Sequence, residues 1–87
     1  MEKTVVIANK AGIHVRPAAK IADLSNKFRA SILFIKDGQA VNAKSIMELL
    51  TLAAGEGTRI IIKAEGEDEA KAISEIEELI NSKFSEE

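Results

Sequence analysis

Hydrophobic and polar positions along the chain follow two periods, one typical of strands and one typical of helices. Four short runs rich in β-branched and apolar residues predict strands at residues 4–8, 31–36, 39–42 and 58–64. The last of these runs is apolar enough for a central strand, whereas the short third run favours a sheet edge. Between the second and third runs, Asp37 and Gly38 form a strong signal for a tight hairpin turn.

Two segments in the first two thirds of the chain have the apolar spacing of amphipathic helices. The first is predicted at residues 16–27 and begins near Pro17, because proline is preorganised for the first helical turn. The second is predicted at residues 45–54. It opens with the S-x-x-E pattern of a capping box, formed by Ser45 and Glu48, and ends at the glycine that follows.

A third helix is predicted to open in the acidic turn at residues 67–69, because carboxylates favour the positive end of a helix dipole. Its isoleucines form one stripe that predicts a buried face, and residues 82–87 after it are expected to fray. The order of elements is therefore β-α-β-β-α-β-α within a chain of 87 residues, a length that predicts one domain over residues 1–87.

This order predicts the fold class α/β (α+β). If the two β-α-β units interleave, neighbouring strands are antiparallel and the three helices cover one face of the sheet. The result is an open-faced β-sandwich with a four-stranded antiparallel sheet. The pattern by itself does not choose between this strand order and the ferredoxin-like one.

Composition narrows the class of function. A net charge of −2 and the lack of Trp and Tyr argue against nucleic acid as a partner and against an RNA-binding module. Without cysteine, the chain has neither disulfides nor thiolate metal ligands. The apolar runs are far shorter than the ~20 residues that span a bilayer, and the first residues do not resemble a signal peptide. We therefore expect a cytoplasmic protein with no membrane insertion.

His14 is the only histidine of the chain and lies at the entry to the first predicted helix. A helix N-terminus is an anion site, and its field also favours a neutral, nucleophilic imidazole. Arg16 adds a planar guanidinium that fits phosphoryl oxygens. Together these groups predict a transient phosphohistidine. On spacing alone, an ordinary surface histidine beside an arginine is the stronger interpretation, and one histidine without cysteines or nearby carboxylates predicts no metal site.

A family resemblance changes this balance. The segment GIHVRPA at residues 12–18 resembles the active-site loop of the HPr family, the phosphocarriers of the bacterial phosphoenolpyruvate:sugar phosphotransferase system. The segment VNAKSIM at residues 41–47 is similar to the second signature of that family, and the similarity continues over essentially the whole chain. The resemblance implies the strand order 1-4-2-3, with His14 accepting a phosphoryl group through Nδ1 and Arg16 as its electrostatic partner.

The resemblance also implies a phosphoryl relay rather than an enzyme, with no cofactor. The implied donor is enzyme I charged by phosphoenolpyruvate, and the implied acceptors are the phosphoacceptor domains of sugar permeases. We expect a monomer. A second hypothesis is a regulatory domain that signals by its phosphorylation state and serves no permease. Both hypotheses need His14, so the sequence does not separate them, nor does it identify a sugar.

The second signature contains three further candidates. The family counterpart of Ser45 is phosphorylated in some bacteria by a Ser-directed HPr kinase/phosphorylase, so Ser45 is a candidate regulatory site. Capping already explains Ser45 without regulation and is the stronger interpretation, and Glu48 differs from the glycine found in kinase-regulated relatives. Ile46 and Met47 are candidate residues for partner docking. Helical spacing leaves open whether Ile46 is part of the core, while Met47 lies off the apolar line.

Overall fold

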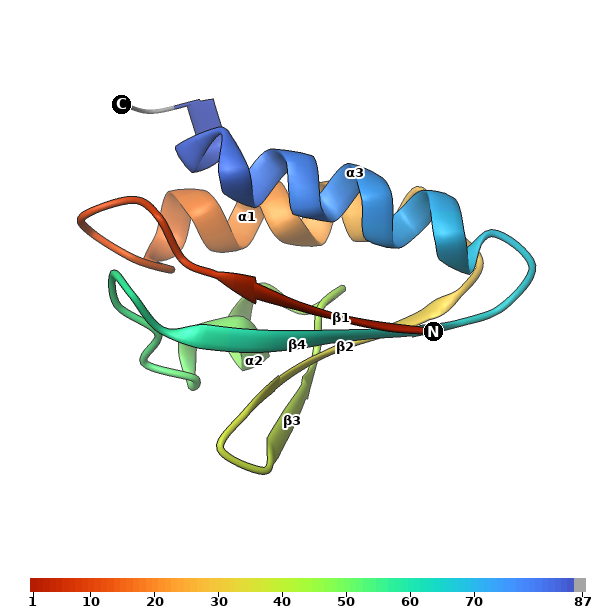
Figure 1. Cartoon of the computed structure of the whole chain (residues 1–87), viewed down its shortest axis with the longest axis horizontal. Coiled ribbons are helices and arrows are strands. Elements are labelled where there is room, and N and C mark those ends of the chain that lie inside the picture. Colours follow the sequence, from red (N-terminus) through yellow and green to blue (C-terminus); the bar gives the residue numbers. More distant parts are fainter. Residues whose placement is uncertain (86–87) are drawn as a thin grey trace.

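The computed structural model describes residues 1–85, which form one four-stranded sheet and three α-helices (Figure 1). In chain order, the elements are β1 (Glu2–Val6), α1 (Val15–Ser25), β2 (Ser31–Lys36), β3 (Gln39–Asn42), α2 (Ile46–Leu50), β4 (Arg59–Glu65), α3 (Glu69–Asn81) and the short 3-10 turn η1 (Lys83–Ser85). The strand order is β1-β4-β2-β3 and every neighbouring pair is antiparallel. The predicted fold class and element order are confirmed.

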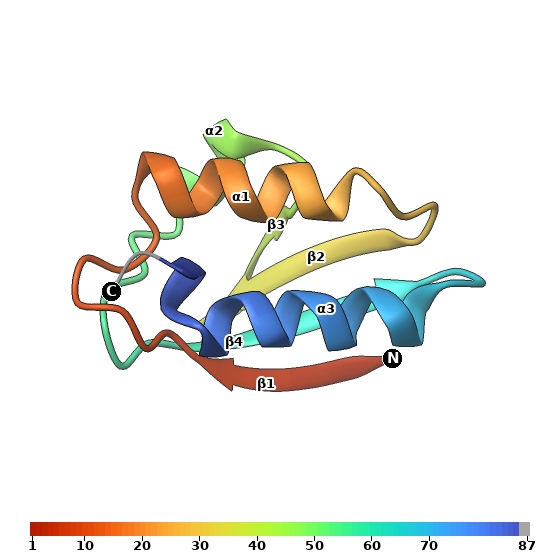
Figure 2. The same ribbon diagram turned by 90° about the horizontal axis from the view of Figure 1, so that it is seen from above.

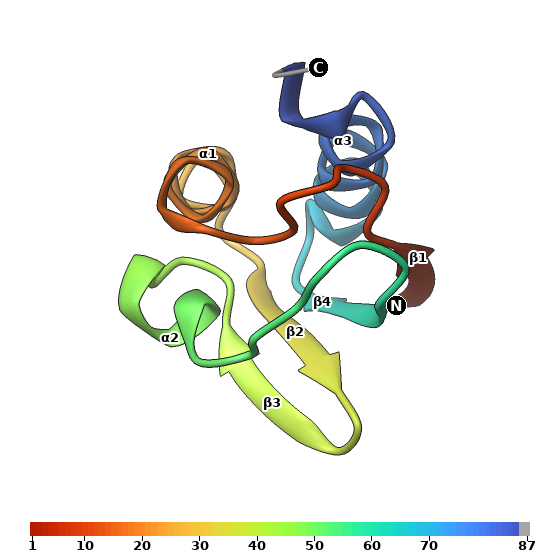
Figure 3. The same cartoon turned by 90° about the vertical axis from the view of Figure 1, so that its left-hand side faces the viewer.

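The helices lie on one side of the curved sheet and leave its other face open (Figure 3). Helices α1 and α3 run side by side, and α2 packs beside α1 near the β3 edge (Figure 2). The tight turn between β2 and β3 places Asp37 at φ 49° and Gly38 at φ 83°. Two successive positive φ values define the turn type whose twist matches a hairpin, as the Asp-Gly pair predicts.

The core lies between the sheet and the two long helices. Alternate residues of β4, namely Ile60, Ile62 and Ala64, are completely buried. The predicted isoleucine stripe of α3 is confirmed, because Ile73, Ile76 and Ile80 are all buried, together with Ala72. Within residues 1–85, none of the helices has the length and apolar character that crossing a bilayer requires.

The second helix is shorter than predicted. Sequence spacing predicted residues 45–54, but α2 ends at Leu50. The amides of Thr51 and Leu52 bond to carbonyls three residues back, and the Thr51 hydroxyl donates to the Glu48 carbonyl at 2.6 Å. A side chain that bonds a preceding carbonyl in this way competes with continued helix. Ala53 then adopts φ 51°, which directs the chain away from the helix axis.

The expectation that residues 82–87 fray is wrong for the part that the structure describes, which ends at Ser85. Phe84 is completely buried, and Lys20 Nζ donates to the Phe84 carbonyl oxygen at 2.6 Å. A large aromatic side chain that leaves water stabilises a short segment that has no regular ladder of its own. Residues 86–87 lie outside the described residues.

The third helix begins at Glu69, so only the last residue of the predicted acidic turn is helical. Asp68 precedes it but makes no cap hydrogen bond. Its carboxylate accepts the backbone N–H groups of Arg29 and Ala30 instead, both at 2.9 Å. The bond from Arg29 has the largest effect and lowers the Asp68 pKa below its ordinary value of 3.8. Burial has the next largest effect and raises this pKa, while the bond from Ala30, the N–H of Asp68 itself and the nearby charge of Lys44 add to the lowering.

We therefore predict a pH-dependent effect of Asp68→Asn. Because the folded pKa is lowered, the carboxylate stabilises the fold above the unfolded pKa, and this contribution is lost as pH falls through the folded value. The variant should melt below the wild-type protein at pH 7, and the difference should shrink at acid pH. Thermal melts followed by circular dichroism test this, with the exposed Glu67→Gln as the control. A difference that is constant with pH would contradict the assignment.

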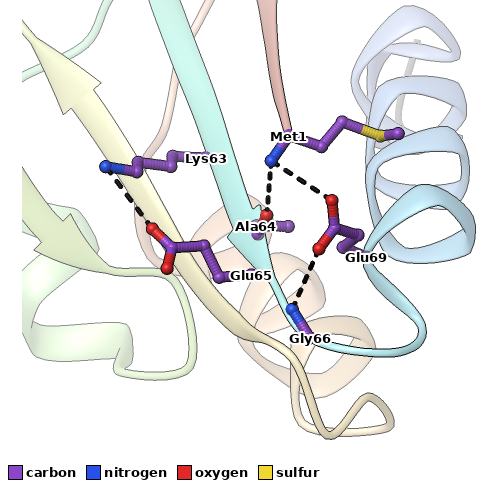
Figure 4. Close-up of polar contacts among 6 residues, drawn as sticks. All are labelled: Met1, Lys63, Ala64, Glu65, Gly66 and Glu69. Carbon is purple, nitrogen blue, oxygen red and sulfur yellow. Dashed lines mark hydrogen bonds and ion pairs between the residues drawn. The ribbon is translucent and has the colours of Figure 1, made fainter.

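The end of the molecule that carries the N-terminus is held by a small polar network (Figure 4). The ammonium group of Met1 donates to the Ala64 carbonyl at 2.9 Å and pairs with Glu69 at 3.3 Å. Glu69 also accepts the N–H of Gly66 at 3.1 Å, and this bond together with the ammonium lowers the Glu69 pKa. The network joins β1, β4 and α3 at the end opposite the loop that leads into α1 (Figure 1).

Candidate functional site

His14 is the N-cap residue of α1 and is exposed to solvent. Its backbone is extended, at φ −101° and ψ −166°, as is usual for an N-cap, and its carbonyl accepts the N–H of Ala18 at 2.9 Å. The imidazole does not form the hydrogen bond that N-cap side chains often make to the helix. The side chain is therefore at the surface, beside the start of the helix, and does not serve to close it.

The first turn of α1 has the electrostatic character of an anion site. It contains the exposed Arg16 and no acidic residue, and the helix begins at Val15, one residue before the predicted start. The helix is 11 residues long, so its positive end is well developed. A helix N-terminus and a guanidinium beside His14 can stabilise a phosphoryl group attached to the ring.

The loop before His14 is held by contacts that join two distant segments. The buried Asn9 donates from Nδ2 to the Gly12 carbonyl at 2.8 Å, and the Gly12 N–H donates to the Asn9 carbonyl at 3.2 Å. The Ile13 N–H donates to the Ala54 carbonyl at 2.8 Å. Gly12 has φ 70°, and a Cβ there would lie 2.3 Å from the Ala54 oxygen. Only glycine therefore fits at this position.

Sequence reasoning identified His14 and Arg16 but missed Asn9. An asparagine three residues before a glycine in a loop is a signal for a local turn held by the side-chain amide. The docking of Gly12 on Ala54 has no local signal, because it joins residues 42 positions apart.

Ser45 forms the predicted cap of α2. Its Oγ accepts the N–H of Glu48 at 3.2 Å. A capping box also requires the Glu48 side chain to accept the N–H of Ser45. This part of the prediction is wrong, because the Ser45 N–H donates to the Asn42 carbonyl at 3.0 Å. Glu48 Oε1 accepts the N–H of Asn42 at 3.1 Å, so this carboxylate reaches past the cap to the last residue of β3. The arrangement fixes the start of α2 to the sheet edge.

We predict that Ser45→Ala lowers the free energy of unfolding by about 0.5–2 kcal/mol, the usual cost of losing an N-cap hydroxyl. Ser45→Asp should retain much of the stability, because aspartate also accepts from the helix. Denaturant unfolding measures both values. Ser74→Ala, at an exposed position inside α3, is the matched control and should not be destabilised. Equal stability of Ser45→Ala and the wild-type protein would rule out the capping role.

The two candidate docking residues are both exposed. Met47 is 75% exposed and Ile46 is 37% exposed, so the alternative in which Ile46 belongs to the core is wrong. Leu49, on the same helix, is the residue of α2 that is fully buried. Val15 on α1 is 63% exposed and was missed by sequence reasoning. Ile46, Met47 and Val15 lie on two helices that pack together, and we call them the apolar docking residues.

Within residues 1–85, no group of three or more His, Cys, Asp or Glu residues is arranged to hold a metal ion. An open depression of about 420 Å³ lies between α1 and α3, lined by Leu24, Glu75, Glu78, Leu79, Ser82 and Ser85. Neither His14 nor Arg16 lines it, so the candidate chemistry belongs to the surface of the molecule.

Comparison with known proteins agrees with this geometry. The chain matches the PTS-HPr family, described as "PTS HPr component phosphorylation site", over residues 1–82. It is 46% identical to the phosphocarrier protein HPr of Treponema pallidum over 85 residues, covering 98% of this chain and 97% of the relative. A crystal structure of HPr-C-His from Thermoanaerobacter tengcongensis superposes with a TM-score of 0.96 at 45% identity, covering 100% of this chain and 98% of that one. A second structure from that organism, described as an HPr dimer, gives a TM-score of 0.78 at 44% identity, covering 97% of each chain.

A small open-faced sandwich with a histidine at the start of its first helix defines a class of phosphocarrier domains. The chain belongs to the HPr family of the phosphotransferase system.

Proposed function

We propose that this chain accepts a phosphoryl group on Nδ1 of His14 from phosphoenolpyruvate-charged enzyme I and passes it to phosphoacceptor domains of sugar permeases. The observation that carries the proposal is the position of His14, an exposed N-cap residue whose ring does not cap the helix. In its neutral form, the ring nitrogen forms a bond to phosphorus while the bond between phosphorus and the donor breaks. The second transfer reverses this step and returns the imidazole.

The first turn of α1 assists both transfers. Its dipole and the guanidinium of Arg16 act on negative charge that develops on the phosphoryl oxygens as the group moves. Since this charge is greatest during transfer, we assign Arg16 to the stabilisation of the transition state rather than to docking. The chain supplies one nucleophile and its electrostatic surroundings, so it turns over only together with its partner enzymes.

The apolar docking residues are proposed to meet those partners. Exposed apolar side chains next to a reactive group favour protein contacts, and methionine adapts to partners of different shape. Ile46 and Met47 lie on α2, which packs against α1, and Val15 directly follows the exposed His14 at the start of α1. We place this encounter in the cytosol. The expected monomer stays a prediction, because one related structure is a dimer.

A regulatory role of Ser45 is a separate proposal, with a Ser-directed kinase as the partner. A phosphate on Ser45 Oγ would share the first turn of α2 with the negatively charged Glu48. Like charges in this position disfavour the phosphorylated state, so the cap explains Ser45 better. Slower phosphorylation of His14 in Ser45→Asp than in the wild-type protein would support regulation, and equal rates would remove it.

The relay is tested by incubation with phosphoenolpyruvate and an HPr-type enzyme I. We expect one phosphoryl group per chain, acid-labile and base-stable as a phosphohistidine is, and its discharge by a permease phosphoacceptor domain. Uptake without discharge by any such domain would favour the regulatory alternative. No uptake at all would contradict the proposed function.

A further inference from the structure

The loop between β1 and α1, residues 7–14, ends at His14 and is hydrogen-bonded to the segment between α2 and β4, residues 51–58. Three backbone bonds join the two: Ile7 N–H to the Thr58 carbonyl at 2.9 Å, Gly57 N–H to the Ile7 carbonyl at 2.8 Å and Ile13 N–H to the Ala54 carbonyl at 2.8 Å. Figure 3 shows this segment passing beside the loop that enters α1. Ile13 directly precedes His14, so the Ala54 carbonyl is the nearest of these anchors to the reactive residue.

The segment has no regular structure of its own to hold that carbonyl in place. Residues 51–58 are turns and irregular backbone. Ala53 adopts φ 51°, a left-handed conformation that residues with a Cβ adopt at a cost. A strained residue persists only when its surroundings fix it.

Lys36 bonds to the two peptide groups that flank Ala53. It is the last residue of β2, and its half-buried side chain reaches across to the carbonyls that follow α2. Its Nζ donates to the Leu52 carbonyl at 2.9 Å and to the Ala53 carbonyl at 3.3 Å. Lysine ammonium groups suit the carbonyls beyond a helix C-terminus. A charged donor strengthens such bonds, and the part-buried one to Leu52 is the shorter of the two. The Ala53 carbonyl belongs to the peptide that joins Ala53 to Ala54.

We infer that Lys36 is a positioning residue for phosphoryl transfer at His14, acting through the Ala53–Ala54 peptide and the hydrogen bond from Ile13. This inference rests on the proposed function for its catalytic consequence, but its structural content does not. Loss of the ammonium should release the strained Ala53, loosen the Ala54 carbonyl and free the backbone that enters α1. The N-cap geometry of His14 is then held less tightly.

The structural step is tested by amide hydrogen exchange of the whole protein. Lys36→Met keeps an unbranched side chain one atom shorter and removes its charge and donors. In this variant the Ile13 amide should exchange about tenfold faster, the scale expected for loss of a charged hydrogen bond. Amides of the β1–β4 ladder should be unchanged. Lys36→Arg should restore most of the protection, because a guanidinium also donates to two carbonyls.

The catalytic step is tested by phosphorylation kinetics with enzyme I. For Lys36→Met we expect a several-fold lower kcat with little change in KM, because the geometry at His14 rather than docking is altered, and recovery in Lys36→Arg. Lys63→Met is the control: this lysine on β4 pairs with Glu65 at 3.5 Å (Figure 4) and should change neither readout.

Two outcomes overturn the inference. One is unchanged exchange of the Ile13 amide in Lys36→Met, whether or not the protein is phosphorylated. The other is faster exchange with unchanged kcat, which shows that the contact holds the loop without positioning His14. Failure of the wild-type protein to accept phosphate instead contradicts the proposed function, and the exchange experiment still decides the structural step.

Discussion

His14→Ala is expected to receive no phosphoryl group from enzyme I under conditions in which the wild-type protein is fully labelled. The reason is chemical: no other imidazole exists in the chain, and without it the transferred group has no nucleophile at the start of α1. Intact mass measured before and after incubation with phosphoenolpyruvate and enzyme I provides the readout.

The same variant should keep its fold. The His14 side chain is exposed and makes no cap hydrogen bond, so its removal leaves α1 and the core in place. A circular dichroism melt close to that of the wild-type protein separates loss of the acceptor from loss of the fold. If the alanine variant is labelled as well as the wild-type protein, the phosphoryl acceptor is a different residue.

Arg16→Ala should slow phosphoryl transfer by about 10²–10³-fold, the usual effect of removing a donor that stabilises charge developing in a transition state. Docking should change less than the rate of transfer, because the guanidinium acts on charge that appears during the reaction. Arg16→Lys should be partly active, since it keeps the charge and loses the planar fork. Initial rates of phosphorylation by enzyme I, measured at several concentrations of each variant, give kcat and KM separately.

The matched control is Lys27→Ala, which removes an exposed cation just beyond the other end of α1. A similar loss of rate in this variant would indicate a general effect of net charge rather than a role of Arg16. Transfer by Arg16→Ala at the wild-type rate would remove Arg16 from the mechanism.

Most of the fold could be predicted because its signals are local. The Asp37-Gly38 turn, the capping hydroxyl of Ser45 and the isoleucine stripe of α3 each depend on residues close together in sequence. The errors occur where distant groups decide. Phe84 looked like part of a fraying tail, but it is buried against the rest of the fold and held by Lys20, 64 positions away.

The reactive residues could be predicted and their supports could not. His14 and Arg16 are neighbours in sequence, at the entry of a helix that has a clear period. Asn9 was missed because its buried amide acts on a backbone carbonyl, which leaves no pattern of charges or apolar residues. Glu48 was assigned to the right helix turn but to the wrong partner, because the N–H of Asn42 is brought to it by the end of β3.

The close approach of Gly12 to Ala54 sets a condition for transplanting this histidine into another scaffold. A graft of residues 9–18 alone would carry the helix entry but lose the carbonyl that receives the Ile13 N–H and the backbone surface against which Gly12 lies. The minimal transferable unit is therefore discontinuous, and it includes residues 52–58 in the same relative placement. A designer who copies only the contiguous motif should obtain a histidine at a helix start without the rigid frame that this protein gives it.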